Sequence, residues 1–104
     1  MDKILIFAGT TEGRILTEAI CRDDSEKRHV ITCVATEYGK HLLPEESENL
    51  TVLAGRMEPE EMRALMEKEA VCQVIDATHP YARQASANIR EAAEEAGISY
   101  LRLL

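Results

Sequence analysis

The sequence predicts an α/β fold built on a doubly wound parallel sheet of five strands. Two observations lead to this prediction. Short apolar runs rich in β-branched residues alternate with helical stretches, and the first runs are apolar throughout, as in strands buried on both faces. Right-handed crossovers then favour the strand order 3-2-1-4-5. The chain has 104 residues, 45 % hydrophobic and 4 % aromatic, which suits one domain with an aliphatic core.

The first expected strand, residues 4–8, leads through a Gly–Thr turn into a helix over residues 11–21. This helix should turn an apolar stripe toward the sheet, and the stripe is expected to consist of Ile15, Leu16, Ala19 and Ile20. The other strands are expected at residues 29–35, 50–54, 71–76 and 98–103.

The remaining helical segments carry start and stop signals. A short helical turn at residues 40–43 is stopped or redirected by Pro44. Pro59, with glutamates around it, marks the start of a longer helix. A further helix over residues 82–96 is closed by Gly97. These elements give a Rossmann- or flavodoxin-like three-layer sandwich in one domain.

The junction between the first strand and the first helix has features of a phosphate-binding loop. Gly9, Thr10 and Thr11 stand where backbone N–H groups and the positive end of the helix dipole favour an anion. The dinucleotide fingerprint G-x-G-x-x-G is incomplete, because Ala8 and Thr10 occupy its first two glycine positions and only Gly13 matches. The alternative is an ordinary tight turn with a helix cap.

Charge and cysteine content exclude several classes of function. A net charge of −7 argues against binding to nucleic acid or an anionic membrane. The three cysteines, Cys21, Cys33 and Cys72, form no C-x-x-C pair, so neither a metal site nor a disulfide framework is expected. His29 and His41 are expected at the surface. The sequence has no membrane-span or signal-peptide pattern, and a soluble cytoplasmic protein is expected.

The predicted topology brings two polar segments together. The strand order reverses between the first and fourth strands, so their carboxyl ends open a crevice. The first strand delivers Gly9, Thr10, Thr11 and Glu12 to this crevice, and the fourth delivers residues 76–80. A ligand site is therefore expected at these two strand tips.

Several segments resemble one known family over essentially the whole chain. They are FAGTTEGR, VATEYG, the Gly55–Arg56 pair, DATHPYA and the closing SYLRL, of which DATHPYA is the most specific. Together they resemble the precorrin-6A reductase (cobalt-precorrin-6A reductase) family of corrin-ring, or vitamin B12, biosynthesis. The resemblance implies a chain roughly twice this length, with two α/β domains facing each other across a cleft, of which this chain is the amino-terminal half.

The resemblance also implies an activity. Members of the family transfer hydride from NADPH to a double bond of a tetrapyrrole macrocycle. The missing carboxyl-terminal domain would form the second wall of the site, so the isolated chain is expected not to turn over. The alternative is a non-catalytic nucleotide- or ligand-binding module with the same fold, because fold alone does not fix chemistry.

With this resemblance, the residues expected to bind the cofactor are Gly9, Thr10, Thr11, Thr36, Arg56 and Thr78. Thr36 follows the second strand, where an NAD-specific site would carry an acid, and its hydroxyl is compatible with a 2′-phosphate. Arg56 could add positive charge there; its alternative is a surface ion pair with Glu58 or Glu60.

A second group of residues is expected to contact substrate or cofactor. Glu12 either accepts a hydrogen bond from ribose or macrocycle, or caps the helix, and the cap is favoured. Asp76 should fix the following threonine or a turn N–H through its carboxylate. His79 is the candidate proton donor, with ligand contact favoured over acid catalysis. Pro80 restricts His79 to an extended turn, and Tyr81 either stacks on a ring or packs under the helix.

Overall fold

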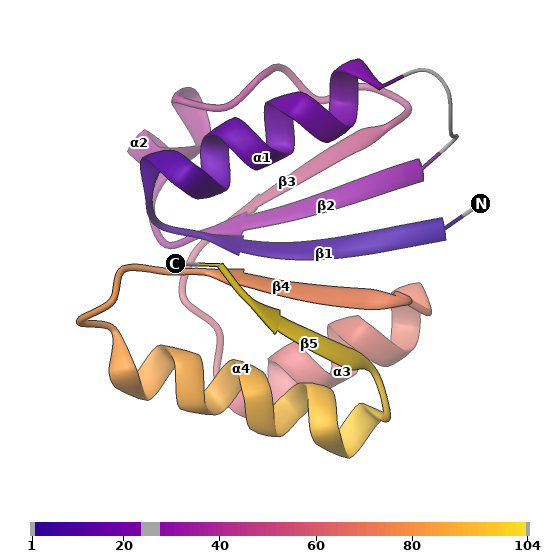
Figure 1. Ribbon diagram of the computed structural model, residues 1–104, viewed down its shortest axis with the longest axis vertical. Helices are drawn as coiled ribbons and strands as arrows, with labels where there is room; N and C mark the ends of the chain where they lie inside the picture. Colours follow the sequence, from indigo (N-terminus) through magenta and orange to yellow (C-terminus); the bar gives the residue numbers. More distant parts are fainter. Residues whose placement is uncertain (1, 24–27, 104) are drawn as a thin grey trace.

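A computed structural model describes residues 2–23 and 28–103 of the chain. Strands and helices alternate along the chain (Figure 1). Their bounds are β1 (Asp2–Ala8), α1 (Thr11–Arg22), β2 (Arg28–Val34), α2 (Glu37–His41), β3 (Leu50–Ala54), α3 (Pro59–Glu69), β4 (Gln73–Ala77), α4 (Arg83–Ala96) and β5 (Ser99–Arg102).

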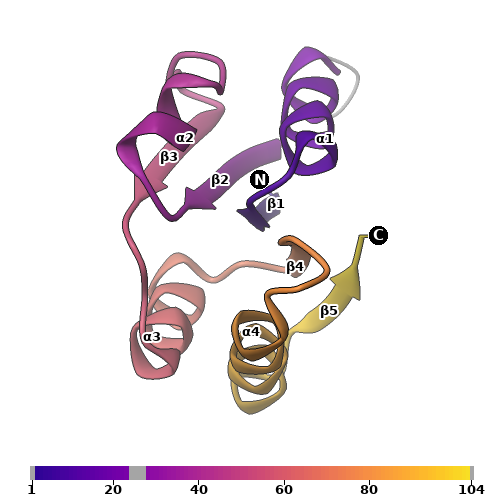
Figure 2. The same ribbon diagram turned by 90° about the vertical axis from the view of Figure 1, so that its left-hand side faces the viewer.

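All strand pairs are parallel and the order is β3-β2-β1-β4-β5, which confirms the predicted topology. Helices α1 and α2 cover one face of the sheet, and α3 and α4 cover the other (Figure 2). The central strand β1 pairs with β2 on one side and with β4 on the other. The carboxyl ends of the strands therefore meet at one edge of the sheet, opposite the amino terminus (Figure 1).

The core consists of two aliphatic clusters, one on each face of the sheet. Leu5 points into the cluster beneath α3 and α4, which includes Met66 and Ile89. Its neighbours Ile4 and Ile6 belong to the cluster on the α1 face. This alternation follows from the two-residue period of a strand, and it explains why β1 is apolar at successive positions.

Helix α1 presents only part of the predicted stripe to the sheet: Leu16 and Ile20 pack against the cluster on the α1 face. Ile15 is 56 % exposed and Ala19 is exposed, whereas Gly13 and Thr17 are buried. The hydroxyl of Thr17 donates to the carbonyl of Gly13 at 2.9 Å and shares a 3.1 Å hydrogen bond with the hydroxyl of Thr32. A polar side chain whose hydrogen bonds are satisfied can occupy a core position. The pattern of apolar residues alone therefore could not identify Thr17 as buried.

Several other element boundaries differ from the prediction, and three of the starting residues have a clear physical reason. Helix α2 starts earlier than residue 40, because the Thr36 hydroxyl accepts the Gly39 N–H at 3.0 Å and caps the helix. Strand β4 starts later than residue 71, because α3 closes with Ala70 in the left-handed conformation, at φ 51°. Strand β5 starts at Ser99, after Gly97 has ended α4 at φ 71°.

His29 is not a simple surface residue. Its ring is half-buried, with Nε2 2.8 Å from the Thr51 hydroxyl and Nδ1 3.0 Å from the Glu48 carbonyl. His29 therefore ties β2 to β3 and to the loop before it, far from the carboxyl edge. His41, by contrast, is exposed, as predicted.

All three cysteines are free. Burial raises the pKa of the Cys33 thiol to about 12, which keeps it protonated and unreactive. Within the described ranges, none of the helices combines the length and apolarity that a membrane span needs.

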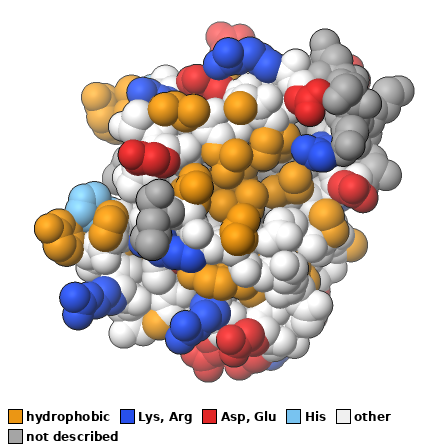
Figure 3. Space-filling model, viewed as in Figure 1, with side chains coloured by type: hydrophobic (Ala, Val, Ile, Leu, Met, Phe, Trp, Pro, Cys, Tyr) orange, Lys and Arg blue, Asp and Glu red, His pale blue; other side chains and the backbone are white. Residues whose placement is uncertain are grey.

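Apolar side chains gather on the open surface between α1 and β5 (Figure 3). Leu101 on β5 is 55 % exposed there, and Leu103 is only partly buried against the α1-side cluster. Contiguous exposed apolar surface is typical of a binding surface.

Candidate functional site

The tips of β1 and β4 lie side by side, as the topology predicted. Ala8 and Ala77 are register partners at the ends of these strands. The hydroxyl of Thr10 donates to the Ala77 carbonyl at 2.9 Å. A Cβ atom added to Gly9 would lie 3.7 Å from the Cα of Thr78, so the two polar loops lie next to each other.

A hollow of about 770 Å³ opens at this edge of the sheet, the edge that faces the viewer in Figure 2. Its volume lies in the usual range of small-molecule sites. The loops after three strands and the start of α1 line it, contributing Gly9, Thr10, Thr11, Glu12, Arg14, Thr36, Thr78, His79 and Pro80. Most of the predicted site residues therefore converge on one concavity.

Thr10 organises the loop that follows β1. Its backbone is extended, at φ −135°, and its hydroxyl accepts the Gly13 N–H at 3.2 Å while donating to the β4 tip. The N–H groups of Thr11 and Glu12 belong to the first turn of α1, where no intrahelical acceptor exists. Such groups, at the positive end of a helix dipole, suit an anion.

Gly13 allows the helix to start close to the sheet. A Cβ atom at this position would lie 3.0 Å from the Cβ atoms of both Ala8 and Ala77. Close helix–strand packing is the role of the third glycine in the dinucleotide fingerprint. Ala8, at the first glycine position, is the last residue of β1 and has strand conformation, so it needs no glycine.

The buried Asp76 holds the loop that follows β4. Its Oδ1 accepts the N–H of Thr78 at 3.0 Å and the Thr78 hydroxyl at 2.7 Å, as predicted. Its Oδ2 accepts the Tyr100 hydroxyl at 2.7 Å, and Arg102 lies 3.3 Å from Oδ1. Arg102 also donates to the carbonyls of Asp76 and Thr78, at 3.0 and 2.9 Å. Asp76 is fully buried, and its hydrogen bonds position the loop.

The charge of Asp76 depends on its hydrogen bonds. Burial favours the neutral acid, but the hydroxyls of Ser86, Tyr100 and Thr78 and the Thr78 N–H outweigh it and lower the pKa of Asp76. The same environment, burial first and then the Asp76 carboxylate, raises the pKa of Tyr100 to about 12. The network therefore contains a carboxylate and a protonated phenol at neutral pH.

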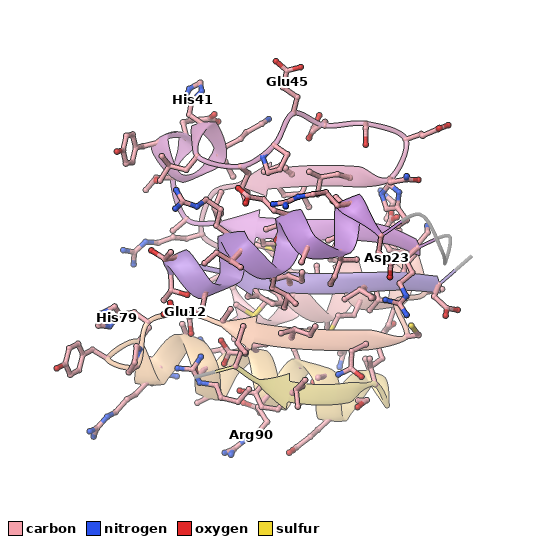
Figure 4. The ribbon with its side chains drawn as sticks, turned by 45° about the horizontal axis from the view of Figure 1, so that its top comes forward. Glu12, Asp23, His41, Glu45, His79 and Arg90 are labelled. Atoms are coloured by element: carbon pink, nitrogen blue, oxygen red, sulfur yellow. The ribbon has the colours of Figure 1, made fainter. Side chains whose placement is uncertain are left out.

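His79 and Tyr81 lie at the outer rim of the β4–α4 loop. The Nδ1 of His79 accepts the Tyr81 N–H at 3.2 Å, which leaves the proton of the neutral ring on Nε2. The two rings contact each other, with centroids 4.8 Å apart. Tyr81 is 85 % exposed, so it does not pack under the helix. His79, from the β4–α4 loop, and Glu12, from the first turn of α1, lie at the same edge of the sheet (Figure 4).

Two charged residues differ from their predicted roles. Arg56 is exposed and lies outside the hollow, because the chain leaves the sheet edge at Gly55, where φ is 124°. Arg14, one turn into α1, lines the hollow instead. The N-cap residue of α1 is Thr10, not Glu12 as predicted. Glu12 is exposed in the first turn of the helix.

Comparison with known proteins gives the chain a family. The sequence pattern of the precorrin-6x reductases CbiJ/CobK matches residues 3–104.

The chain belongs to this family.

Individual precorrin-6x reductase relatives cover nearly the whole chain. The cobalt-precorrin-6A reductase of Salmonella typhimurium (strain LT2) is 35 % identical over 96 residues, or 91 % of the chain. That of Methanothermobacter thermautotrophicus is 31 % identical over 99 residues, or 95 % of the chain. The solved structure of the CobK precorrin-6A reductase superposes on 99 % of the chain with a TM-score of 0.79 and 26 % identity.

The relatives are longer than the resemblance implied. This chain spans 34 % of the Salmonella reductase, 32 % of the Methanothermobacter reductase and 39 % of the CobK structure. It therefore corresponds to about a third of the length of these precorrin-6x reductases rather than to half.

Proposed function

We propose that this chain binds NADPH in the hollow at the carboxyl ends of β1, β2 and β4, as the cofactor domain of a precorrin-6A reductase. The observation that carries the proposal is the meeting of the Thr10 and Thr78 loops at the switch point of the sheet. Ligands of doubly wound folds bind at this point. Membership of the precorrin-6x reductase family supports a reductive role in cobalamin biosynthesis.

The residues around the hollow suit a phosphorylated dinucleotide. Thr10 caps the amino-terminal end of α1. The N–H groups of Thr11 and Glu12, in the first turn of this helix, would bind a phosphate. Arg14 lines the same hollow as Thr36 and would neutralise a 2′-phosphate. When bound, NADPH supplies the hydride that reduces a macrocycle double bond.

His79 would hold the proton that such a reduction needs. Its Nδ1 is occupied by the Tyr81 N–H, so Nε2 is the atom that carries a proton toward a ligand. The Asp76 network fixes the loop on which His79 stands, which limits the positions that the ring can adopt.

We expect the chain to act together with the additional residues that its longer relatives contain. The hollow is open on one side, and a macrocycle needs a second wall to exclude water. The exposed apolar surface at Leu101 and Leu103 offers a face for that part. We therefore expect the isolated chain to bind NADPH without reducing precorrin-6A. Absorbance measurements with precorrin-6A test this expectation, and measurable turnover would contradict it.

Titration with NADPH, followed by nicotinamide fluorescence, tests the cofactor proposal. Thr11→Glu places a carboxylate in the first turn of α1, where it favours the helix but repels phosphate. We expect it to raise the Kd for NADPH by about tenfold. Ala19→Glu adds the same charge at an exposed position of the same helix and is the control. Equal Kd values for the two variants would contradict a phosphate site at this loop.

A pair of arginine variants tests which cation selects NADPH over NADH. Arg14→Gln removes the guanidinium at the hollow, and we expect it to lower the preference for NADPH by about tenfold. Arg56→Gln, an equal change of charge outside the hollow, should leave the preference unaltered. Isothermal titration with both cofactors measures the ratio. If Arg56→Gln lost the preference for NADPH and Arg14→Gln kept it, Arg56 rather than Arg14 would be the cation that selects NADPH.

A further inference from the structure

A tight turn, residues 79–82, connects β4 to α4. The N–H of Ala82 donates to the carbonyl of His79 at 2.8 Å, which closes a β-turn with Pro80 at its second position. The Nδ1 atom of His79 accepts the N–H of Tyr81 at 3.2 Å. Asp and Asn side chains commonly accept the N–H two residues later in a turn of this kind. In this chain an imidazole nitrogen has that role.

The segments on either side of the turn are anchored more firmly than the turn itself. The N–H and hydroxyl of Thr78 donate to the buried Asp76, and its carbonyl accepts from Arg102. Ser86, in α4, shares a 3.1 Å hydrogen bond with the Thr78 hydroxyl. Residues 79–81 are exposed, and in the described part of the chain their hydrogen bonds are the two that close the turn. The turn is therefore the part of the loop that is free to move.

The start of α4 makes a positive charge on His79 unfavourable. The N-cap residue of this helix is Ala82, whose side chain forms no capping hydrogen bond, and its first turn contains no acidic residue. Arg83, the first residue of the helix, is exposed. The positive end of the helix dipole thus follows His79 closely in the chain, without a carboxylate from the helix to offset it.

Protonation of His79 would remove the acceptor that holds the Tyr81 N–H. A neutral imidazole has one N–H group and one bare nitrogen, whereas both nitrogens of the imidazolium are donors. In the turn the bare nitrogen is Nδ1, so the added proton faces the Tyr81 N–H and two donors oppose each other. Histidine side chains generally change charge between about pH 5 and 8. The closed turn is therefore compatible with only one of the two charge states.

The surroundings of the His79 ring leave it accessible to protons from solvent. The Nε2 atom has no hydrogen-bond partner among the described residues, and the Tyr81 ring contacts the imidazole with centroids 4.8 Å apart. The charged and titratable groups on the surrounding elements are Glu12 and Arg14 on α1, Tyr38 on α2, Asp76 on β4, Arg83 on α4 and Arg102 on β5. Across residues 2–23 and 28–103, none of these side chains forms an ion pair or a hydrogen bond with the imidazole.

We propose that the protonation state of His79 switches the β4–α4 loop between a closed and an open turn. The neutral ring, with its proton on Nε2, closes the turn, and the imidazolium opens it. Thr78, His79 and Pro80 line the hollow at the β1 and β4 tips, so the switch alters one wall of that hollow next to the fixed Thr78. The switch belongs to the chain itself and does not depend on which ligand the hollow binds.

NMR spectra of the labelled chain without ligand, recorded between pH 5 and 8, test the switch. Long-range ¹H–¹⁵N correlations identify the ring tautomer, and we expect the proton of the neutral His79 ring on Nε2. The Tyr81 amide signal should move with the same midpoint as the His79 ring signals. Exchange of the Tyr81 amide with water, relative to an unprotected amide at the same pH, should become about threefold to tenfold faster when the ring is charged, because one hydrogen bond is lost.

Two variants of His79 separate the hydrogen bond from the charge. In His79→Asn, Oδ1 replaces Nδ1 and accepts the Tyr81 N–H at every pH, so the corrected exchange rate should change less than twofold. In His79→Gln the amide lies one bond further from the backbone, and Tyr81 should show the faster exchange throughout. His41→Gln removes another exposed histidine and should leave the response of Tyr81 unaltered.

Three results would overturn the inference: a neutral His79 ring with its proton on Nδ1, a Tyr81 amide that does not respond to the titration, or a response that persists in His79→Asn. The last result would assign the pH dependence to another group. Circular dichroism checks that the variants fold. Because no cofactor is present, a failure of the NADPH proposal leaves this test unaffected.

Discussion

Replacing Asp76 with alanine is expected to lower the free energy of unfolding by about 3–5 kcal/mol, because removing one partner of a buried charged network leaves the others uncompensated. The change removes the carboxylate that faces the Arg102 guanidinium and that accepts the hydroxyls of Thr78 and Tyr100. Urea unfolding measures the loss. Tyr100→Phe removes only one of these hydrogen bonds and should cost about 1–3 kcal/mol. A loss below about 1 kcal/mol in Asp76→Ala would contradict the network's role.

The same network predicts a dependence of stability on pH. The pKa of Asp76 is lower in the folded chain than in the unfolded one, so its stabilising contribution is present above about pH 4 and is lost as the pH falls through the folded value. The pKa of Glu69 is lowered in the same direction by Lys3. Because Glu69 is present in both the unaltered chain and Asp76→Asn, its contribution cancels when the stabilities of the two proteins are compared. The difference in stability between the two proteins should shrink as the pH falls below about 4, and a constant difference would contradict the assignment.

Gly13→Val is expected to destabilise the chain by about 2–3 kcal/mol through overpacking. The added side chain meets Ala8 and Ala77, and the Ala8 Cα, 3.2 Å from the new Cβ, belongs to the central strand and cannot retreat. Gly13→Ala tests the sign of the change in stability. In an open helix this change stabilises by about 1 kcal/mol, whereas here it should destabilise.

Displacement of α1 should also weaken NADPH binding, because the first-turn N–H groups move with the helix. Ala19→Val, on the exposed side of α1, controls for β-branching. Thermal unfolding and NADPH titration provide the two readouts. A Gly13→Ala variant that is more stable than the unaltered chain would show that close packing does not constrain this helix.

The strand order and the meeting of two polar loops could be predicted because they depend on regular features. Apolar runs mark buried strands, and crossover handedness leaves few orders for five of them. Leu16 and Ile20 of the predicted α1 stripe do pack against the sheet, but the burial of Thr17 could not be predicted in the same way. Thr17 is a core residue only because Gly13 and Thr32 satisfy its hydroxyl, and that pairing exists only in three dimensions.

The site residues missed in the sequence have a similar explanation. Arg14 reaches the hollow because Thr10 caps α1 and sets the phase of its first turn. Arg102 could have been found once the strand order was known, since Asp76 and Arg102 are register partners on β4 and β5. Arg56 was misplaced because its neighbour Gly55 turns the chain away from the sheet edge toward α3.

Amide NMR spectra of the labelled chain, recorded with and without NADPH, test the central claim most directly. We expect NADPH to shift the signals of Thr10, Thr11 and Glu12 most strongly, with Thr36 and Thr78 next. NADH should produce smaller shifts near Arg14 and Thr36. Shifts confined to another surface, or no shifts at saturating NADPH, would contradict a cofactor site between the β1 and β4 tips.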